Sequence, residues 1–163
     1  TEAVARALGL AADEIGFDAH RPTLYSAGVG FTFVPVSSLE AAARACPDPR
    51  SWAAGIGPEG HAAAYVYTRE TRDEACHVHA RMFAPGFGIG EDPATGSAVA
   101  AFAGVAMEFE RPDDGEHVLA IEQGLEMGRP SRIVLGMEVR AAVLAQVTIG
   151  GAAVVVARGE IEI

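Results

Sequence analysis

One stretch of this chain limits its possible folds more than any other: the run from Thr95 to Met107 carries no charged residue. With helical periodicity, its larger apolar side chains, among them Val99, Phe102 and Val105, spread around the whole circumference. A helix that is apolar on every side is buried on every side. The sequence therefore predicts a central helix that the rest of the chain surrounds.

The segments around this helix have the patterns of short helices and many strands. Helices are expected at 1–10, with Thr1 as N-cap, and at 39–46, with serine caps before it. Alternating and β-rich patterns predict strands at 25–36, 61–68, 75–84, 117–123, 132–140, 143–149 and 153–158. Gly150-Gly151, before the last of these, has the composition of a tight hairpin turn.

The last third of the chain contains strands but no helical segment between them. A doubly wound α/β fold needs a helix between successive strands, so this class is excluded. We therefore expect a single α+β domain over residues 1–163, with a curved, mostly antiparallel, barrel-like sheet wrapped around the buried central helix.

The residues that open the central helix carry the densest polar chemistry of the chain. Glu91, Asp92, Thr95 and Ser97 lie close together, and Gly96 allows a ligand to approach the backbone. A helix start presents unpaired N–H groups and the positive end of the helix dipole, which together bind anions. An aspartate followed by proline is equally the pattern of an ordinary N-cap. The segment by itself supports a substrate site and a cap about equally.

Two other patterns suggest ligand sites that the sequence does not complete. In the loop that begins Gly86-x-Gly88, Glu91 stands where a dinucleotide-binding loop has its third glycine. His77 and His79 alternate on a predicted strand, but no third and fourth ligand has a suitable spacing. We therefore expect an exposed pair of histidines and no metal site.

Charge and composition limit the classes of partner and the cellular compartment that we expect for this chain. The formal net charge of −10 argues against nucleic acid and against anionic membrane surfaces. All 12 basic residues are arginines, which excludes Schiff-base and P-loop lysine chemistry. The two cysteines are far apart, and no apolar span is long enough to cross a bilayer. These features favour a cytoplasmic protein.

Several motifs in chain order carry a family resemblance. The segment 90–98, Gly-Glu-Asp-Pro-Ala-Thr-Gly-Ser-Ala, with 81–85, 123–133, 149–154 and 159–161, resembles the signature of the phenazine-biosynthesis PhzF-like isomerase family. The resemblance implies a fold similar to diaminopimelate epimerase, in which two pseudo-symmetric halves place an active site between the N-termini of their central helices. It also implies proton transfer, without cofactor or metal, on a small cyclic or amino-acid-like carboxylate similar to trans-2,3-dihydro-3-hydroxyanthranilate.

The resemblance also implies roles for the residues that open the helix. Asp92 matches a carboxylate that assists proton movement, and Ser97 matches a hydroxyl that binds the substrate carboxylate. Glu91, Thr95 and the backbone of Gly96 complete the expected substrate-binding set.

The expected general-base glutamate belongs to a first half that this chain does not contain, so the chain resembles a C-terminal half only. We expect it to work with that missing half or with a second copy of itself as a homodimer. A non-catalytic carboxylate-binding module and an oligomerising half-domain remain open as alternatives.

Overall fold

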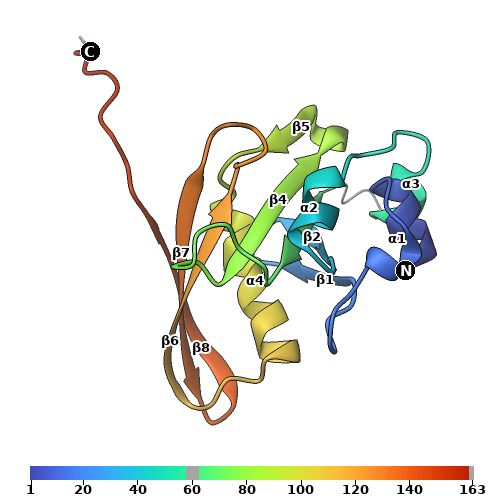
Figure 1. The fold of residues 1–163 in the computed structure, drawn as a ribbon. Coiled ribbons are helices and arrows are strands. Elements are labelled where there is room, and N and C mark those ends of the chain that lie inside the picture. The colour runs from blue at the N-terminus through green and yellow to red at the C-terminus, as the bar shows by residue number, and fades with distance from the viewer. Residues whose placement is uncertain (58–62, 162–163) are drawn as a thin grey trace.

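The computed structural model describes residues 1–57 and 63–161 (Figure 1). Its helices are α1 (Glu2–Ala7), α2 (Leu39–Arg44), α3 (Trp52–Gly55) and α4 (Gly96–Phe109), with 3₁₀ turns η1 (Ala12–Glu14) and η2 (Pro85–Phe87). Its strands are β1 (Thr23–Ser26), β2 (Gly30–Pro35), β3 (Ala64–Thr68), β4 (Val78–Ala84), β5 (Ile89–Asp92), β6 (Gly115–Gln123), β7 (Ser131–Arg140) and β8 (Val143–Gly151).

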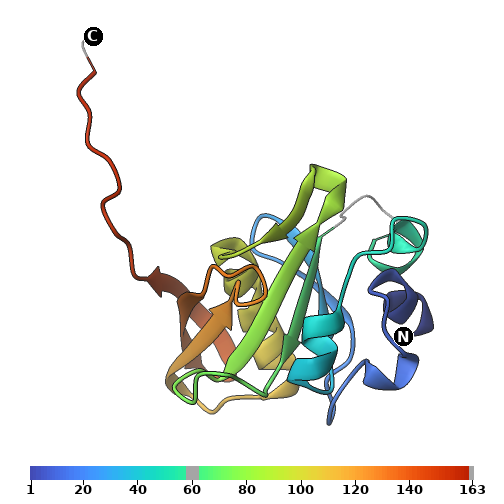
Figure 2. The same ribbon diagram turned by 45° about the horizontal axis from the view of Figure 1, so that its top comes forward.

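These strands form one curled sheet. Its order is β1-β2-β3-β4-β6-β7-β8, and β5 pairs with β4 beside that path. The β2/β3 and β4/β6 pairs are parallel, and the other neighbouring pairs are antiparallel. Helix α4 contacts β1 and β2 at one end of the sheet and β7 and β8 at the other, so the sheet wraps around it (Figures 1 and 2). The predicted α+β architecture is confirmed.

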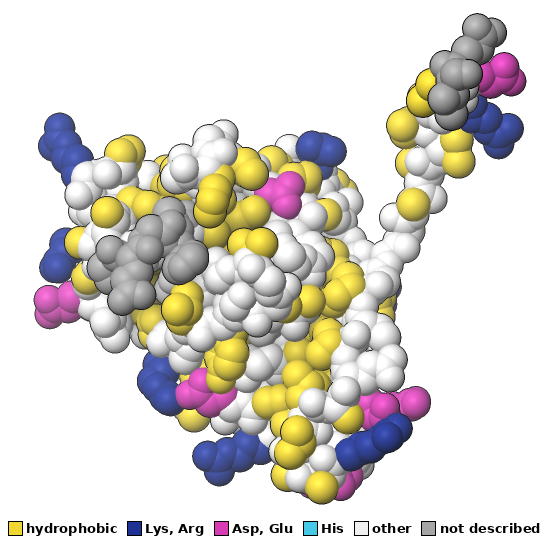
Figure 3. All heavy atoms as spheres, turned by 180° about the vertical axis from the view of Figure 1, so that it is seen from behind, with side chains coloured by type: hydrophobic (Ala, Val, Ile, Leu, Met, Phe, Trp, Pro, Cys, Tyr) yellow, Lys and Arg dark blue, Asp and Glu magenta, His cyan; other side chains and the backbone are white. Residues whose placement is uncertain are grey.

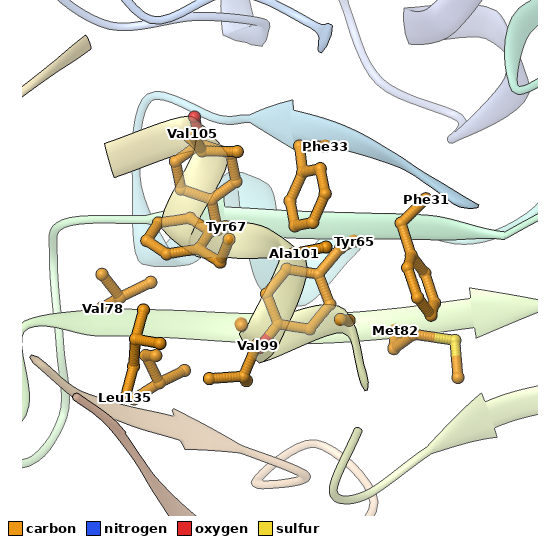
Figure 4. Packing of buried hydrophobic residues seen from close by; sticks show 14 of the residues in the cluster. Phe31, Phe33, Tyr65, Tyr67, Val78, Met82, Val99, Ala101, Val105 and Leu135 are labelled. Carbon is orange, nitrogen blue, oxygen red and sulfur yellow. The ribbon is translucent and has the colours of Figure 1, made fainter. Parts of the chain in front are cut away.

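Helix α4 is buried because apolar side chains surround it. Val99, Phe102 and Val105 are each no more than 4% exposed. The Phe102 ring lies 5.0 Å from the Tyr67 ring and 6.0 Å from the Phe33 ring, measured between centroids. Figure 4 shows Phe33 and Tyr67 among the side chains that fill the space between the helix and the strands. The predicted central helix is thus the core of the domain.

The other face of β2, β3 and β4 packs against α1, α2 and the segment of α3. Val34, Val66 and Phe83 point to that side and join Leu8 and Trp52 in a second buried cluster. These three strands are therefore buried on both faces, which their apolar composition permits. As a result, the polar side of β4 also lies inside the protein.

The tight turn of the last hairpin lies at Ala141-Ala142 and not at Gly150-Gly151, so that prediction was wrong. Both alanines have positive φ, 51° and 59°, as a primed turn requires. Asp114 offsets the strain of this conformation because its two carboxylate oxygens accept the N–H groups of Ala141 and Ala142 at 2.7 and 2.8 Å. These bonds also lower the pKa of Asp114. The two glycines instead continue β8, opposite Val134 and Ile133.

The predicted strand at 153–158 is wrong as well. Residues 152–161 form neither helix nor strand and extend away from the body (Figures 1 and 2). Strand β8 ends where its neighbour β7 nears its first residue, since Gly151 pairs with Ile133. Only Arg132 and Ser131 of β7 remain beyond that point, and residues 152–161 pair with no strand in the described part of the chain.

Smaller differences concern the bounds of elements. The expected strand at 25–36 is a hairpin, β1 and β2, joined through Gly28 with φ 103°. Helix α1 is shorter than 1–10, and the N-cap at Thr1 makes no side-chain bond, whereas Ser38 caps α2 as predicted. The first residues of the strand expected at 61–68 lie outside the described residues. Among the described helices, none is long and apolar enough to cross a membrane.

Candidate functional site

Strand alternation sends Glu91 and Asp92, the last residues of β5, to opposite sides. Glu91 faces Arg81 of β4, whose Nε and Nη2 each donate to its carboxylate at 2.8 Å. Asp92 faces the start of α4, where its Oδ2 accepts a hydrogen bond of 2.6 Å from Thr95 Oγ1. The two neighbouring carboxylates therefore have different surroundings and can have different roles.

Asp92 is not the cap of α4. The helix begins at Gly96 with Thr95 as its N-cap residue, and no side chain caps it. The first intrahelical bond runs from Val99 N to Thr95 O. The N–H groups of the first turn, Gly96 to Ala98, have no partner within the helix by geometry, and Ser97 is exposed beside them. Oxygen acceptors of a ligand can reach this turn.

Gln123, the last residue of β6, lies behind Asp92 and Thr95. Its Nε2 donates to the backbone oxygen of Asp92 at 2.7 Å and to Thr95 Oγ1 at 3.0 Å. Its Oε1 accepts from the Tyr65 hydroxyl at 3.2 Å and from Thr95 N at 3.4 Å. Gln123 is fully buried, so these bonds compensate the burial of its amide.

Arg81 connects β5, the strand that carries Glu91 and Asp92, to helix α2 on the other face of the sheet. Beyond Glu91, its Nη1 donates to the carbonyl oxygens of Ala42, Ala43 and Ala45 at 2.8–3.0 Å. These carbonyls lie at the end of α2, where the helix leaves backbone acceptors without a full set of donors; of the three, Ala42 also accepts from Ala45 N at 3.2 Å. A single side chain, 9% exposed, thus joins α2, β4 and β5.

The pair His77 and His79 does not lie exposed as predicted. His79 is fully buried, with Nδ1 2.8 Å from Glu122 Oε1 and Nε2 3.3 Å from Glu126 Oε1. His77 is exposed, and its Nδ1 accepts from Ala120 N at 3.0 Å. The difference arises because β4 is covered on both faces. Among the described residues, no group of three or more His, Cys, Asp or Glu side chains is arranged to hold a metal ion.

A cavity of about 500 Å³ opens at the other end of α4, lined by residues that include Phe17, His20, Tyr67, Phe102 and Glu110. Three of its polar side chains are paired with one another, because His20 contacts the Tyr67 hydroxyl at 2.8 Å and Glu110 at 2.9 Å. Burial lowers the pKa of His20 below its ordinary value. Burial also raises the pKa of Tyr67, which suits a structural hydrogen bond. The part of the cavity at Glu110 lies one helix length, about 20 Å, from the start of α4.

The structure thus brings Asp92, Thr95, Gly96 and Ser97 together at the mouth of α4, and it turns the Glu91 carboxylate toward Arg81. Sequence analysis missed Gln123, which contacts three of the polar groups here. The available signal was a pair of polar residues, Glu122 and Gln123, after an apolar run at 118–121 and directly before Gly124.

Comparisons with known proteins show the family of this chain. The family model described as phenazine biosynthesis-like protein matches residues 1–159. A Mesorhizobium japonicum protein named an uncharacterized isomerase is 50% identical, over 98% of this chain and 54% of that protein. A trans-2,3-dihydro-3-hydroxyanthranilate isomerase of Pseudomonas chlororaphis is 40% identical, over 50% of this chain and 29% of that protein. The chain spans about half the length of the Mesorhizobium japonicum relative.

Solved structures share the fold. A Bacillus anthracis phenazine biosynthesis protein of the PhzF family superposes with a TM-score of 0.74 at 24% identity, over 91% of this chain and 54% of that one. A predicted epimerase of Pseudomonas aeruginosa superposes with a TM-score of 0.58 at 26% identity, over 94% of this chain and 51% of that one. Because the family match covers nearly the whole sequence, the chain belongs to the phenazine biosynthesis-like, or PhzF, family of isomerase-like proteins.

Proposed function

We propose that this chain forms one wall of the active site of an isomerase that needs no cofactor. The substrate is a small cyclic or amino-acid-like carboxylate similar to trans-2,3-dihydro-3-hydroxyanthranilate, the compound named for several partial relatives. The observation that carries the proposal is the place of Asp92. It lies at the mouth of α4 and bonds to Thr95 without capping the helix.

The surroundings of Asp92 suit proton transfer beside a bound anion. The Ser97 hydroxyl and the N–H groups of the first turn bind the substrate carboxylate, with support from the helix dipole. A base in the other half removes a proton from one carbon, and Asp92 delivers a proton to another, so that substrate and product are isomers. Glu91 acts by fixing β5 through Arg81, and Thr95 acts through its bond to Asp92.

The test uses a fusion of this chain to the first half of the Mesorhizobium japonicum relative, which supplies the missing wall. We expect the fusion to incorporate deuterium from the solvent into trans-2,3-dihydro-3-hydroxyanthranilate, and mass spectrometry measures this incorporation. Asp92→Asn lowers this exchange about 10²–10⁴-fold, since one positioned acid–base group contributes that much. Asp13→Asn, a change of an exposed aspartate remote in sequence, leaves the rate unchanged. Equal rates for both variants would contradict the role of Asp92.

The alternative is a binding module without chemistry, which the first-turn N–H groups of α4 beside the exposed Ser97 favour. In that case the helix mouth holds a small carboxylate through Ser97 and the first-turn N–H groups, and no exchange follows. Titration calorimetry of the fusion with the same compound separates the two functions, because the module gives binding heat without deuterium incorporation.

We also propose that the chain packs against a second folded unit. This unit is the first half of the molecule in a two-half protein, or a second copy of this chain when the chain is alone. Val154, Val155 and Val156 are 83%, 76% and 91% exposed in the extended segment 152–161. Figure 3 shows hydrophobic side chains along this segment, which stands clear of the body. Near the helix mouth, Ile149 of β8 is 40% exposed. Apolar surface of this kind favours association.

Removing the segment after Gly151 tests this proposal. We expect the 163-residue chain to self-associate in light scattering at micromolar concentration and the shortened chain to be monomeric, because the β-branched run is gone. A monomeric mass for the full chain at every concentration would overturn the idea of a homodimer. Loss of the folded circular dichroism signal in the shortened chain would show that the segment stabilises the body itself.

A further inference from the structure

We propose that Gln123 and Gly124 are positioning residues for Asp92, and that they leave Oδ1 of Asp92 as the oxygen that exchanges the proton. This inference rests on the proposed function of the site. It starts from the end of β6, where the buried Gln123 side chain contacts both the backbone of Asp92 and the hydroxyl of Thr95.

The orientation of the Gln123 amide is fixed by two backbone groups. The carbonyl oxygen of Asp92 can only accept, and it lies 2.7 Å from Nε2. The backbone N–H of Thr95 can only donate, and its nitrogen lies 3.4 Å from Oε1. A flipped amide would place oxygen against oxygen at Asp92 and N–H against N–H at Thr95. The NH₂ group of Gln123 therefore faces Asp92.

This orientation sets the direction of the next hydrogen bond. Thr95 Oγ1 lies 3.0 Å from Nε2 of Gln123, a group that only donates, so Oγ1 accepts there. The single hydroxyl proton of Thr95 is then available for Asp92 Oδ2, 2.6 Å away. Oδ2 is held as an acceptor, and the geometry leaves Oδ1 to meet a substrate.

Burial fixes which group donates and which accepts in each of these hydrogen bonds. Gln123 and Tyr65 are fully buried and Thr95 is 7% exposed, so reversing any bond would leave polar groups unpaired in an apolar core. The Tyr65 hydroxyl completes the chain by donating to Gln123 Oε1 at 3.2 Å. Burial raises the pKa of Tyr65, so this hydroxyl keeps its proton.

Gly124 holds the same loop by close contact. Its φ is +79°, and a Cβ there would lie 2.8 Å from the carbonyl oxygen of Pro93 and 2.4 Å from that of Arg129. The backbone between Asp92 and Thr95 therefore rests directly on the backbone at the end of β6. Gln123 supplies the hydrogen bonds and Gly124 the space for this contact.

The first test measures the hydrogen bond itself, in the full chain, by the ¹³C NMR chemical shift of the Asp92 carboxyl carbon at one fixed pH. In Thr95→Val we expect this chemical shift to change, because the hydrogen bond from the Thr95 hydroxyl to Oδ2 is lost. Thr95→Ser keeps the hydroxyl and restores the wild-type chemical shift. Gln123→Glu also changes it, because the new side chain competes as an acceptor for the Thr95 proton. Thr71→Val, which changes a hydroxyl bonded to Cys76 O, leaves it unchanged.

The second test measures deuterium exchange in the fusion with the first half of the Mesorhizobium japonicum relative. We expect Thr95→Val and Gln123→Glu to lower kcat about 10–100-fold, with KM changed much less, since misplacement of a catalytic group affects the chemical step. Thr95→Ser restores most of the rate.

The two tests separate failure of this inference from failure of the proposed function. An unchanged chemical shift of the Asp92 carboxyl carbon in Thr95→Val would overturn the hydrogen-bond relay, whether or not the fusion exchanges deuterium. A wild-type fusion without exchange, combined with the expected changes in chemical shift, would overturn the isomerase and keep only the relay geometry.

Discussion

Replacing Arg81 with methionine is expected to lower the free energy of unfolding by about 3–5 kcal/mol, the usual cost of removing one partner of a buried ion pair. Methionine keeps most of the length of the side chain but none of its donors. Glu91 then loses the guanidinium group that donates two hydrogen bonds to its carboxylate. The carbonyl oxygens of Ala42, Ala43 and Ala45 lose the Nη1 donor that they share. Urea denaturation followed by circular dichroism measures the change.

A surface arginine provides the matched control for this variant. Arg21 pairs with Glu108 at 2.6 Å, but its side chain is 65% exposed, against 9% for Arg81. Arg21→Met should cost less than about 1 kcal/mol, because water screens an exposed pair. Adding Glu91→Leu to Arg81→Met is expected to recover part of the loss, since the uncompensated charge is removed too. Equal costs for Arg81→Met and Arg21→Met would contradict the anchoring role of Arg81.

Phe102→Ala is expected to cost about 3–5 kcal/mol, the range for truncating a buried aromatic residue. Phe102 lies at the centre of α4, 4% exposed, with the ring of Tyr67 in an edge contact at 5.0 Å and that of Phe33 at 6.0 Å. The cavity left behind cannot close, because β2 and β3 are held from their other face as well.

The exposed Phe87 provides the comparison for Phe102. It lies in η2 and is 60% exposed, so Phe87→Ala should change the unfolding free energy by no more than about 0.5 kcal/mol. Thermal unfolding of both variants of the isolated chain checks this. A small effect at Phe102 would mean that α4 is not the centre of the stabilising core.

The site residues could be found in the sequence because they are close together along the chain. Asp92, Thr95 and Ser97 stand within one helical turn of the start of a buried helix, so local geometry brings them together. Gln123 and Arg81 could not be found in this way. Gln123 reaches Asp92 only because β4 and β6 pair in parallel, which brings the end of β6 beside β5 and the start of α4.

The errors at the end of the chain show the limit of local pattern. Alternation and β-branched residues predict a strand at 153–158, but a strand forms only where a neighbouring edge accepts its hydrogen bonds. The position of the last turn was likewise decided by a distant residue, Asp114, which stabilises positive φ at two alanines. The glycine pair at 150–151 by itself predicted the wrong position for this turn.

The buried central helix, the α+β class and the polar cluster at the start of that helix could all be predicted from the sequence, because each depends on residues adjacent in the chain. Local pattern does not predict that Asp92 faces Thr95 while Glu91 faces Arg81, or that Gln123 fixes the direction of the hydrogen bonds behind Asp92. These arrangements arise only in the folded protein, because the partners come from different strands of the curled sheet. Strand pairing, which no local periodicity encodes, sets their distances.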